Sequence, residues 1–338
     1  MNVHQVLSGA GPHDAVSNQA RAFRALFGEW GWGGADVAAG VDPRVGRAFS
    51  PLAALDPAPG DTLLIHYSAY APRLRGVLER PQRKVLLSHN VTPARWFWDY
   101  EPRIAIQCAL GRQQLPEYAA RCDVVAGVSA FNAAELGSDR VVPILFDSAG
   151  LGAPRAAEPA GEPTLLFVGR LAPHKRQDEL IRLVALLRRN GLPEARLVLV
   201  GEPMKPWYLK ELQELATALA PGAVTFRSGL TAEELAAAYA EASLVVCLSE
   251  HEGFCIPLLE AFHVGVPVVA RPVGGIPEVA GDAALLVADR DLAVVAELCR
   301  VALEDGPLRA TLRTRGAARV AHYARGPVAA QLRSLLEG

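Results

Sequence analysis

The sequence predicts an α/β protein made of two doubly wound domains, each a parallel sheet with helices on both faces. Short apolar runs alternate with helical patterns along the whole chain, which indicates βαβ units. The runs are continuously apolar, as in sheets that are covered on both faces. The length of 338 residues exceeds what one ordinary core accommodates, so two domains of about 150 residues are expected.

The expected strands form two sets, one in each half of the chain. The first set lies at residues 2–7, 62–67, 84–89, 124–128 and 141–144. The second lies at residues 163–168, 196–200, 224–227, 244–248, 267–270 and 284–287. Helices are expected between them, for example at residues 17–30, 177–190, 210–219, 232–240 and 257–264.

Residues 148–162 are rich in Gly, Ala and Pro and lack apolar periodicity, so they are expected to link the domains. The first domain would then comprise residues 1–147 and the second residues 163–326. A last helical pattern, within residues 327–338, either stays with the second domain or returns to the first, and the sequence leaves both open.

Composition excludes several classes of protein. The net charge of −2 gives no electrostatic case for binding nucleic acid. Neither a secretory signal pattern nor an apolar run of about 20 residues is found, so a cytoplasmic protein is expected. The cysteines lack CxxC spacing, which argues against a disulfide framework and against a zinc site; they are Cys108, Cys122, Cys247, Cys255 and Cys299.

The most informative stretch is SEHEGFCIPLLEA at residues 249–261, which places Glu252 and Glu260 eight residues apart. It follows a strand pattern, and open α/β sheets bind ligands at the carboxyl ends of their strands. If turn and helix were continuous, the two carboxylates would share one side, about 12 Å apart along the axis. That separation suits the two ends of one elongated ligand better than a single metal ion. Alternatively, Glu252 caps a helix and Glu260 pairs with a surface arginine.

A second candidate element, VGRLAPHKRQ at residues 168–177, follows the first strand of the second domain. Gly169 would let the backbone approach a ligand closely, and Arg170 and Lys175 bring two cations to the start of a helix. Such a group can neutralise a departing diphosphate without a divalent ion. The alternative is a basic turn that faces solvent. A further Gly-rich turn, RPVGGIPEV at residues 271–279, is expected at the same sheet edge.

In their order and spacing, GRLAPHKRQDELI, SEHEGFCIPLLEA and VGGIPEV resemble the retaining GT-B glycosyltransferases, and within them the bacterial glycan-synthesis group of family 4. The resemblance covers the second domain. It implies two Rossmann-like domains that face a central cleft, with the donor nucleotide-sugar on the second domain and the acceptor on the first. It also implies transfer with retention of anomeric configuration, without a metal or other cofactor.

The resemblance implies roles for individual residues. Arg170 and Lys175 match the pair that binds the diphosphate. Glu252 matches the glutamate near the transferred sugar, and Glu260 the glutamate on the ribose hydroxyls. Further donor contacts are implied at Gly169, Gly253, Phe254, Cys255 and Ile256. Cys255 stands where the common EGFG pattern has its last glycine, so donor preference is expected to depart from the family there.

The first domain matches the family through LLSHNVTP at residues 86–93 and the loop SGAGPHDAVS at residues 8–17. His89 is implied to contact the donor sugar or the reacting centre; the alternative is a histidine satisfied by backbone. The loop lies where the family's glycine loop approaches phosphate and acceptor, which makes Gly11, His13 and Asp14 candidates. Because the loop is not GxGxxG, no dinucleotide cofactor is expected. Asp14 either binds an acceptor hydroxyl or caps a helix.

The function expected from this resemblance is a hexosyltransferase of polysaccharide biosynthesis. A UDP-sugar is the favoured donor and GDP-mannose the next. The acceptor is a hydroxyl of a glycan, a lipid-linked molecule or a small molecule, with peripheral contact at the inner membrane face. The aromatic segment RWFWDY at residues 95–100 can stack on an acceptor, rest on lipid or form core, and all three readings stay open. The alternatives are a nucleotide-sugar epimerase, a sugar phosphorylase or a non-catalytic nucleotide-sugar binding protein.

Overall fold

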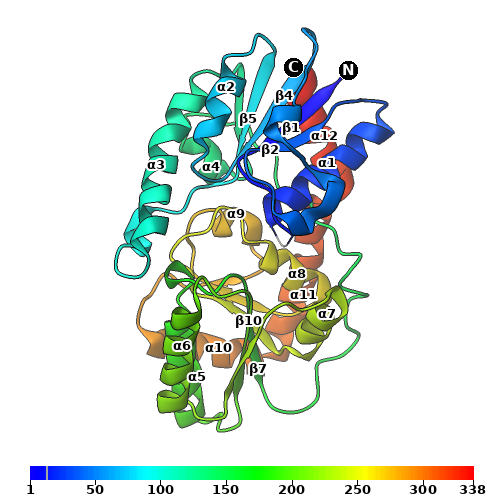
Figure 1. Cartoon of the computed structure of the whole chain (residues 1–338). Helices are drawn as coiled ribbons and strands as arrows, with labels where there is room; N and C mark the ends of the chain where they lie inside the picture. The colour runs from blue at the N-terminus through cyan, green and yellow to red at the C-terminus, as the bar shows by residue number, and fades with distance from the viewer. Residues whose placement is uncertain (13) are drawn as a thin grey trace. The chain divides into compact units, whose positions relative to one another are not determined.

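The computed structural model describes residues 1–12 and 14–338, which form two compact units (Figure 1). Unit 1 comprises Met1–Leu145 together with Arg325–Gly338, and unit 2 comprises Phe146–Ala324. His13, a candidate of the N-terminal loop, lies outside the described residues. Within the part of the chain that is described, no helix combines the length and apolarity needed to cross a bilayer.

Unit 1 is a six-stranded parallel sheet of order β3-β2-β1-β4-β5-β6. Its strands are β1 (Val3–Leu7), β2 (Asp36–Ala38), β3 (Ser50–Pro51), β4 (Thr62–Tyr67), β5 (Arg83–Ser88) and β6 (Val124–Gly127). Its helices are α1 (Ala15–Glu29), α2 (Arg75–Leu78), α3 (Pro102–Ala119), α4 (Ala130–Ala134) and α12 (Arg325–Glu337), with short 3-10 turns between them. Strand order reverses between β1 and β4, which makes this edge the topological switch point.

Unit 2 repeats this arrangement as a six-stranded sheet of order β12-β11-β10-β7-β8-β9. Its strands are β7 (Thr164–Val168), β8 (Arg196–Val200), β9 (Val224–Arg227), β10 (Leu244–Cys247), β11 (Val268–Ala270) and β12 (Leu285–Leu286). Its α-helices are α5 (Gln177–Arg189), α6 (Pro206–Leu219), α7 (Ala232–Glu241), α8 (Ile256–Val264), α9 (Ile276–Ala280), α10 (Leu292–Glu304) and α11 (Gly306–His322). Its switch point lies between β7 and β10.

Burial explains why these segments adopt their structures. In unit 2, β7, β8 and β10 bury their aliphatic side chains, and helix α5 covers the sheet with a stripe of residues three and four apart. That stripe is Leu180, Leu183, Val184 and Leu187, each at most 2% exposed. The expected class, two Rossmann-like doubly wound domains, is therefore confirmed.

Three expectations for unit 1 need correction. The strand expected at residues 141–144 is wrong, because only a single bridge joins Val141 to β6. Pro143 cannot donate to a ladder, and Gln19 instead holds the segment by hydrogen bonds to the Pro143 carbonyl (3.0 Å) and the Leu145 amide (2.8 Å). Strands β2 and β3 were not expected, because they are only three and two residues long.

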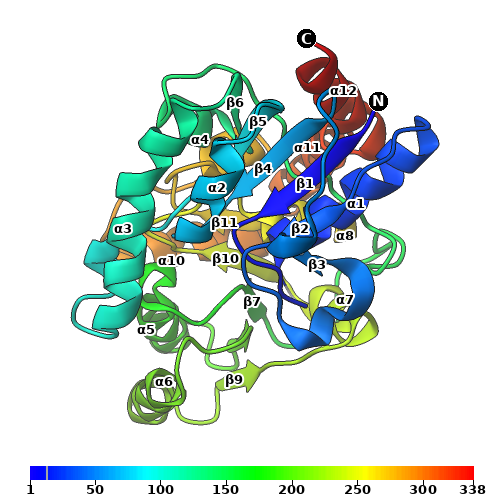
Figure 2. The same ribbon diagram turned by 45° about the horizontal axis from the view of Figure 1, so that its top comes forward.

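The segment that connects the two strand sets belongs to unit 2, whereas the last helix belongs to unit 1. Residues 147–162 are all described and contain no helix or strand; Arg155 donates its backbone N–H to Val264 in unit 2 (3.0 Å). Helix α12 lies in unit 1 beside α1, as Figures 1 and 2 both show. There the guanidinium carbon of Arg333 lies 5.7 Å from the ring centroid of Trp30 and 5.9 Å from that of Trp32.

Candidate functional site

The candidate site of unit 2 forms where the turns after β7 and β10 meet, at the switch point of the sheet. The Lys175 Nζ lies 2.6 Å from Glu252 Oε2, and the two side chains are only 16% and 10% exposed. Ser249 donates a hydrogen bond to the other oxygen, Oε1 (2.8 Å). Burial alone would lower the pKa of Lys175, but the adjacent Glu252 carboxylate outweighs this effect and raises it. The lysine is therefore a fixed cation.

The turn after β7 is shaped by glycine and braced by a buried amide. Gly169 has φ +150°. A Cβ atom added at Gly201 would lie only 2.0 Å from the Gly169 carbonyl oxygen, so position 201 accepts only glycine. Gln177 is fully buried, donating to the Arg170 carbonyl (3.0 Å) and accepting from the Ala172 amide (3.3 Å). The Arg170 side chain is exposed at this strand end, and helix α5 begins directly behind Lys175.

Turn and helix are not continuous between the two glutamates, so the condition under which both carboxylates would share one side is not met. Helix α8 begins at Ile256, and Cys255 before it adopts a left-handed conformation (φ 81°, ψ 67°) that turns the chain. Glu252 pairs with Lys175 rather than capping α8. Glu260, on α8, accepts from the Tyr239 hydroxyl (2.5 Å) rather than from a surface arginine. Burial raises the pKa of Glu260, and the Tyr239 hydrogen bond only partly offsets this.

The third Gly-rich turn, after β11, lies directly against the Glu252 turn. Gly275 donates its N–H to the Glu252 carbonyl (3.0 Å). A Cβ at Gly274, which has φ +56°, would lie 1.9 Å from that carbonyl oxygen, and one at Gly275 would lie 2.4 Å from the Gly253 oxygen. Only glycine permits this approach. Phe254, 3% exposed, packs edge-on against Tyr323 (5.3 Å between ring centroids).

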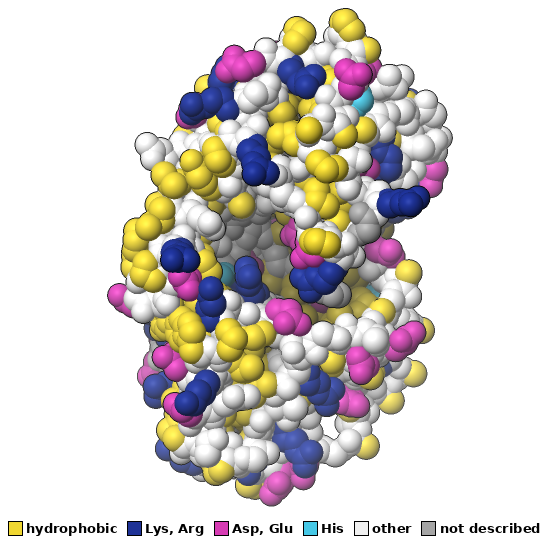
Figure 3. Space-filling view, viewed as in Figure 1, with side chains coloured by type: hydrophobic (Ala, Val, Ile, Leu, Met, Phe, Trp, Pro, Cys, Tyr) yellow, Lys and Arg dark blue, Asp and Glu magenta, His cyan; other side chains and the backbone are white. Residues whose placement is uncertain are grey.

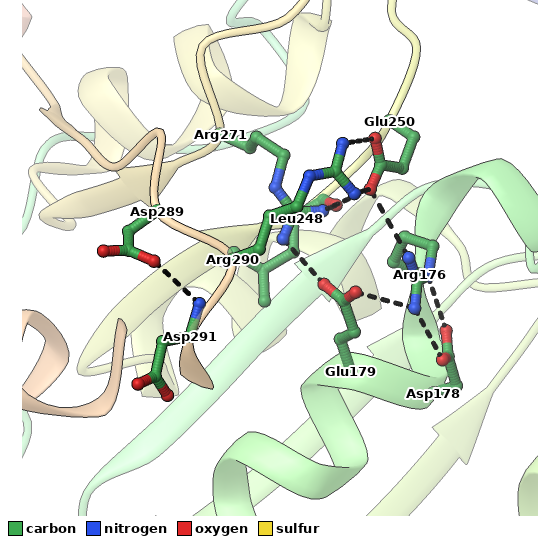
Figure 4. A network of polar contacts seen from close by, with 9 residues as sticks. All are labelled: Arg176, Asp178, Glu179, Leu248, Glu250, Arg271, Asp289, Arg290 and Asp291. Atoms are coloured by element: carbon green, nitrogen blue, oxygen red, sulfur yellow. Dashed lines mark hydrogen bonds and ion pairs between the residues drawn. The ribbon is translucent and has the colours of Figure 1, made fainter. Parts of the chain in front are cut away.

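A buried ion network ties these turns together (Figure 4). Glu250, with a side chain only 4% exposed, accepts from Arg271 (3.0 Å) and from Arg290 (2.5 and 2.8 Å). Arg271 also donates to the Leu248 carbonyl (2.7 Å) and pairs with Glu179 on α5 (2.8 Å). The network therefore joins the loops after β10, β11 and β12 to the start of α5. No motif predicted this network, because a sequence shows which residues are charged but not which of them are buried.

In unit 1, His89 follows β5 and belongs to a chain of buried polar side chains. Its Nε2 lies 2.9 Å from Nδ1 of His66, whose own Nε2 lies 3.0 Å from Gln5 Oε1. The Gln5 amide nitrogen donates to the Ala20 carbonyl and to Asp36 (both 2.8 Å). The Gln5 oxygen therefore needs a donor, so His66 carries its proton on Nε2 and His89 donates from its Nε2.

Burial keeps both histidines of this chain neutral. Burial lowers the pKa of His89 to about 3. Burial, with a contribution from His89, also lowers the pKa of His66 well below its usual range. With the proton of His89 on Nε2, its buried Nδ1 is a hydrogen-bond acceptor, and it has no partner within the described residues. A side chain, and not only backbone, thus holds His89.

The N-terminal loop is organised by capping. Asp14 caps helix α1 by accepting from the amides of Val16 (3.3 Å) and Ser17 (3.1 Å). The Ser17 hydroxyl donates to Asp14 (2.8 Å) and accepts from the Gly11 amide (3.0 Å). Of the two readings of Asp14, the structure contains the cap.

The aromatic segment of unit 1 is divided between core and surface. Phe97 is buried at 5% exposure, whereas Trp98 and Tyr100 are 48% and 39% exposed. On the neighbouring helix α3, Ile106 and Leu110 are also exposed, at 48% and 37%. Hydrophobic side chains gather along the α3 side of this unit in Figure 3.

The group of side chains suited to a metal ion is Cys247, Glu252 and Cys255, whose ligand atoms all lie within 4.8 Å of one another. This group had no signal in the cysteine spacing, because the reversal at the end of β10 brings its members together. Within the described residues, the cysteines form no disulfide bonds.

Comparison with known proteins shows which proteins this chain is similar to. Residues 153–319 match the family model described as "Glycosyl transferases group 1". The D-inositol 3-phosphate glycosyltransferase of Nocardia farcinica is 38% identical over 170 residues, which are 48% of this chain and 37% of that protein. A GDP-mannose-dependent alpha-mannosyltransferase of Mycolicibacterium smegmatis is 41% identical over 121 residues, 36% of this chain and 28% of that protein. The chain thus spans well under half the length of these curated relatives.

A solved structure resembles the whole chain. The crystal structure of Alr3699/HepE from Anabaena in complex with UDP and glucose has a TM-score of 0.78 at 16% identity, with 99% of both chains covered. At this identity the likeness defines the fold, which is the GT-B fold of two Rossmann-like domains. The family match lies within unit 2, and the likeness of fold extends over both units.

The ion network predicts a specific pattern of stability. Glu250→Gln removes one of the two carboxylates that pair with Arg271, which is 2% exposed and keeps Glu179. The substitution is expected to lower the free energy of unfolding of unit 2 by about 1.5–3 kcal/mol. The matched control is Arg290→Ala. Its side chain is 67% exposed, so the loss is expected to be about 1 kcal/mol or less. Urea unfolding followed by tryptophan fluorescence and circular dichroism measures both, and equal losses would contradict the assignment of Glu250 as the buried centre.

Proposed function

We propose that this protein is a glycosyltransferase of the EC 2.4 kind, which moves a sugar from a nucleotide-diphosphate sugar to an acceptor hydroxyl. The observation that carries the proposal is the Lys175–Glu252 pair at the switch point of unit 2 (2.6 Å), within a segment matching the glycosyl transferases group 1. A buried cation beside the first turn of α5 is suited to stabilise the charge of a departing diphosphate.

The finer proposal is a retaining, metal-independent enzyme of family 4. The acceptor oxygen forms its bond to the anomeric carbon on the face from which the diphosphate leaves, while the bond from that carbon to the phosphate oxygen breaks. The departing phosphate oxygen takes the acceptor proton, so no strong side-chain base is needed. Lys175, Arg170 and the backbone N–H groups of Gly253 and Phe254 stabilise the charge on the phosphates. The two cations supply the charge stabilisation that a divalent ion would otherwise provide.

The two glutamates take opposite ends of the donor in this proposal. Glu252 lies near the transferred sugar, where its pairing with Lys175 links the sugar end to the diphosphate. Glu260 meets the ribose hydroxyls through Oε1, since Oε2 already accepts from Tyr239. The backbone at Gly169, Cys255 and Ile256 completes the donor contacts.

Residues of unit 1 are proposed to serve the sugar and the acceptor. His89 contacts the transferred sugar or the reacting centre, and its acceptor atom Nδ1 suits a hydroxyl donor. The loop with Gly11, His13 and Asp14 contacts phosphate or acceptor. The exposed Trp98 and Tyr100 support peripheral contact with the inner membrane face, where a cytoplasmic enzyme would meet a lipid-linked acceptor.

A UDP-sugar is the favoured donor, followed by GDP-mannose. The solved structure of similar fold contains UDP and glucose, and one sequence relative is named GDP-mannose-dependent. The acceptor class is a glycan, lipid-linked or small-molecule hydroxyl, in line with the inositol phosphate of another relative's name. An epimerase would convert the donor without an acceptor, and a non-catalytic binding protein would not convert it at all. The two sequence relatives are named as transferases, which favours neither alternative.

Replacing Lys175 tests the site. Lys175→Ala is expected to lower turnover by at least about 100-fold, because the departing charge loses its fixed cation. Lys175→Arg keeps the charge and should lose less. The control Lys210→Ala removes an exposed lysine of α6 and should turn over normally. The assay measures nucleoside diphosphate release from UDP- and GDP-sugars. Because Lys175→Ala leaves Glu252 unpaired, thermal unfolding must show that the variant is folded; a folded variant with normal turnover would contradict the assignment.

The stereochemistry of the product tests the finer proposal. With an α-linked nucleotide-sugar donor, the expected product has an α-linkage, because attack and departure share one face of the sugar. Proton NMR of the anomeric signal during the first turnovers reads the outcome directly. A β-linked product would overturn retention while leaving the transferase activity in place.

A further inference from the structure

Two buried cysteines stand beside the Lys175–Glu252 pair. Cys247 ends β10 and is 4% exposed, and Cys255 precedes α8 and is 8% exposed. Their Sγ atoms lie 3.9 Å apart, and Cys247 Sγ lies 3.9 Å from Glu252 Oε1. We propose that Cys247, Cys255 and Glu252 bind a thiophilic divalent cation such as Zn²⁺ or Cd²⁺, which the proposed transfer reaction does not use.

The separations of the ligand atoms fit a tetrahedral ion. At Zn–S distances of about 2.3 Å, two thiolates on a tetrahedral ion lie about 3.8 Å apart, and a thiolate and a carboxylate oxygen lie about 3.6 Å apart. The two separations from Cys247 Sγ, to Cys255 Sγ and to Glu252 Oε1, are both 3.9 Å, and the ligand atoms of all three residues lie within 4.8 Å of one another. Small side-chain rotations therefore bring the atoms to an ion, and a fourth position is left to water.

The charges also balance. The buried cluster contains one cation, Lys175, and one anion, Glu252, which cancel. Each thiol must lose its proton to become a ligand, so binding exchanges two protons for one divalent ion. The net charge of the cluster is then unchanged, which avoids the cost of burying a new charge beside Lys175.

The surrounding turns hold the ligands in place. Cys255 keeps a left-handed backbone (φ 81°), a conformation that non-glycine residues adopt mainly where the surrounding structure imposes it. The Gly275 amide fixes the Glu252 carbonyl (3.0 Å), and the Ser249 hydroxyl orients the carboxylate oxygen Oε1 that faces Cys247 (2.8 Å). Ligands fixed in this way lose little entropy on binding an ion.

The ligand types set the selectivity. Two thiolates and one carboxylate favour Zn²⁺ and Cd²⁺, whereas Mg²⁺ prefers a shell of oxygen atoms. An ion here would hold Glu252 Oε1 and occupy space next to the proposed transferred sugar. Inhibition of donor turnover by Zn²⁺ therefore rests on the proposed function, but binding of the ion does not.

Cadmium titration of the full-length, reduced protein without donor tests the site. The wild type is expected to develop thiolate-to-cadmium charge-transfer absorption with a stoichiometric endpoint and to release about two protons per ion. Cys247→Ser and Cys255→Gly should weaken this binding by more than about 100-fold, beyond the loss typical of residues that only support a ligand. Cys255→Gly should fold well, because glycine accepts the left-handed backbone.

The control variant is Cys108→Ser, which removes a half-exposed thiol of α3 in unit 1 and should bind as the wild type does. Mg²⁺ should not compete with Cd²⁺. The proposal is overturned if wild type and both site variants bind Cd²⁺ equally, or if Cys108→Ser loses binding instead. Mass spectrometry of protein purified without reductant shows whether Cys247 and Cys255 form a disulfide. If they do, and if reducing that disulfide does not restore Cd²⁺ binding, the proposal is also overturned.

Discussion

The ion pair between Lys175 and Glu252 is the contact around which unit 2 is arranged at its switch point. It joins the turn after β7 to the turn after β10, which are far apart in sequence and neighbours in the sheet (2.6 Å between the charged atoms). Because both side chains are largely buried, neither charge is stable there alone. The pair keeps the Lys175 ammonium charged at the sheet edge, where open α/β folds bind their ligands.

Three further features keep this pair in position. The close approach of Gly274 and Gly275 sets the backbone of Glu252, and the Glu250 network anchors the same turn to α5 and to the loops after β11 and β12. The left-handed Cys255 then separates Glu252 from helix α8 and places its thiol near that of Cys247. In unit 1 the Gln5–His66–His89 chain fixes the tautomers of both histidines, because the Gln5 oxygen must accept a hydrogen bond from His66.

Periodicity predicted much of the fold, motif spacing singled out the turns of the candidate site, and physical reasons explain what was missed. Continuous apolar runs located the buried strands, whereas β2 and β3 are too short to leave a pattern and Pro143 prevents a strand where one was expected. The motifs singled out Lys175 and Glu252 as candidate residues, but they did not predict the direct contact between the two. Sequence reasoning missed Glu250, Arg271 and His66, because a sequence does not show which charged and polar side chains are buried.

The affinity for nucleoside diphosphates against monophosphates tests the central claim most directly, namely that the Lys175–Glu252 turn receives the diphosphate. Isothermal titration calorimetry with UDP, UMP, GDP and GMP measures these affinities for the wild type and for Lys175→Ala. The diphosphate of the preferred base is expected to bind at least about tenfold more tightly than its monophosphate, and Lys175→Ala should remove most of that difference. Equal affinity for both forms in the wild type, or an unchanged difference in the variant, would contradict the account.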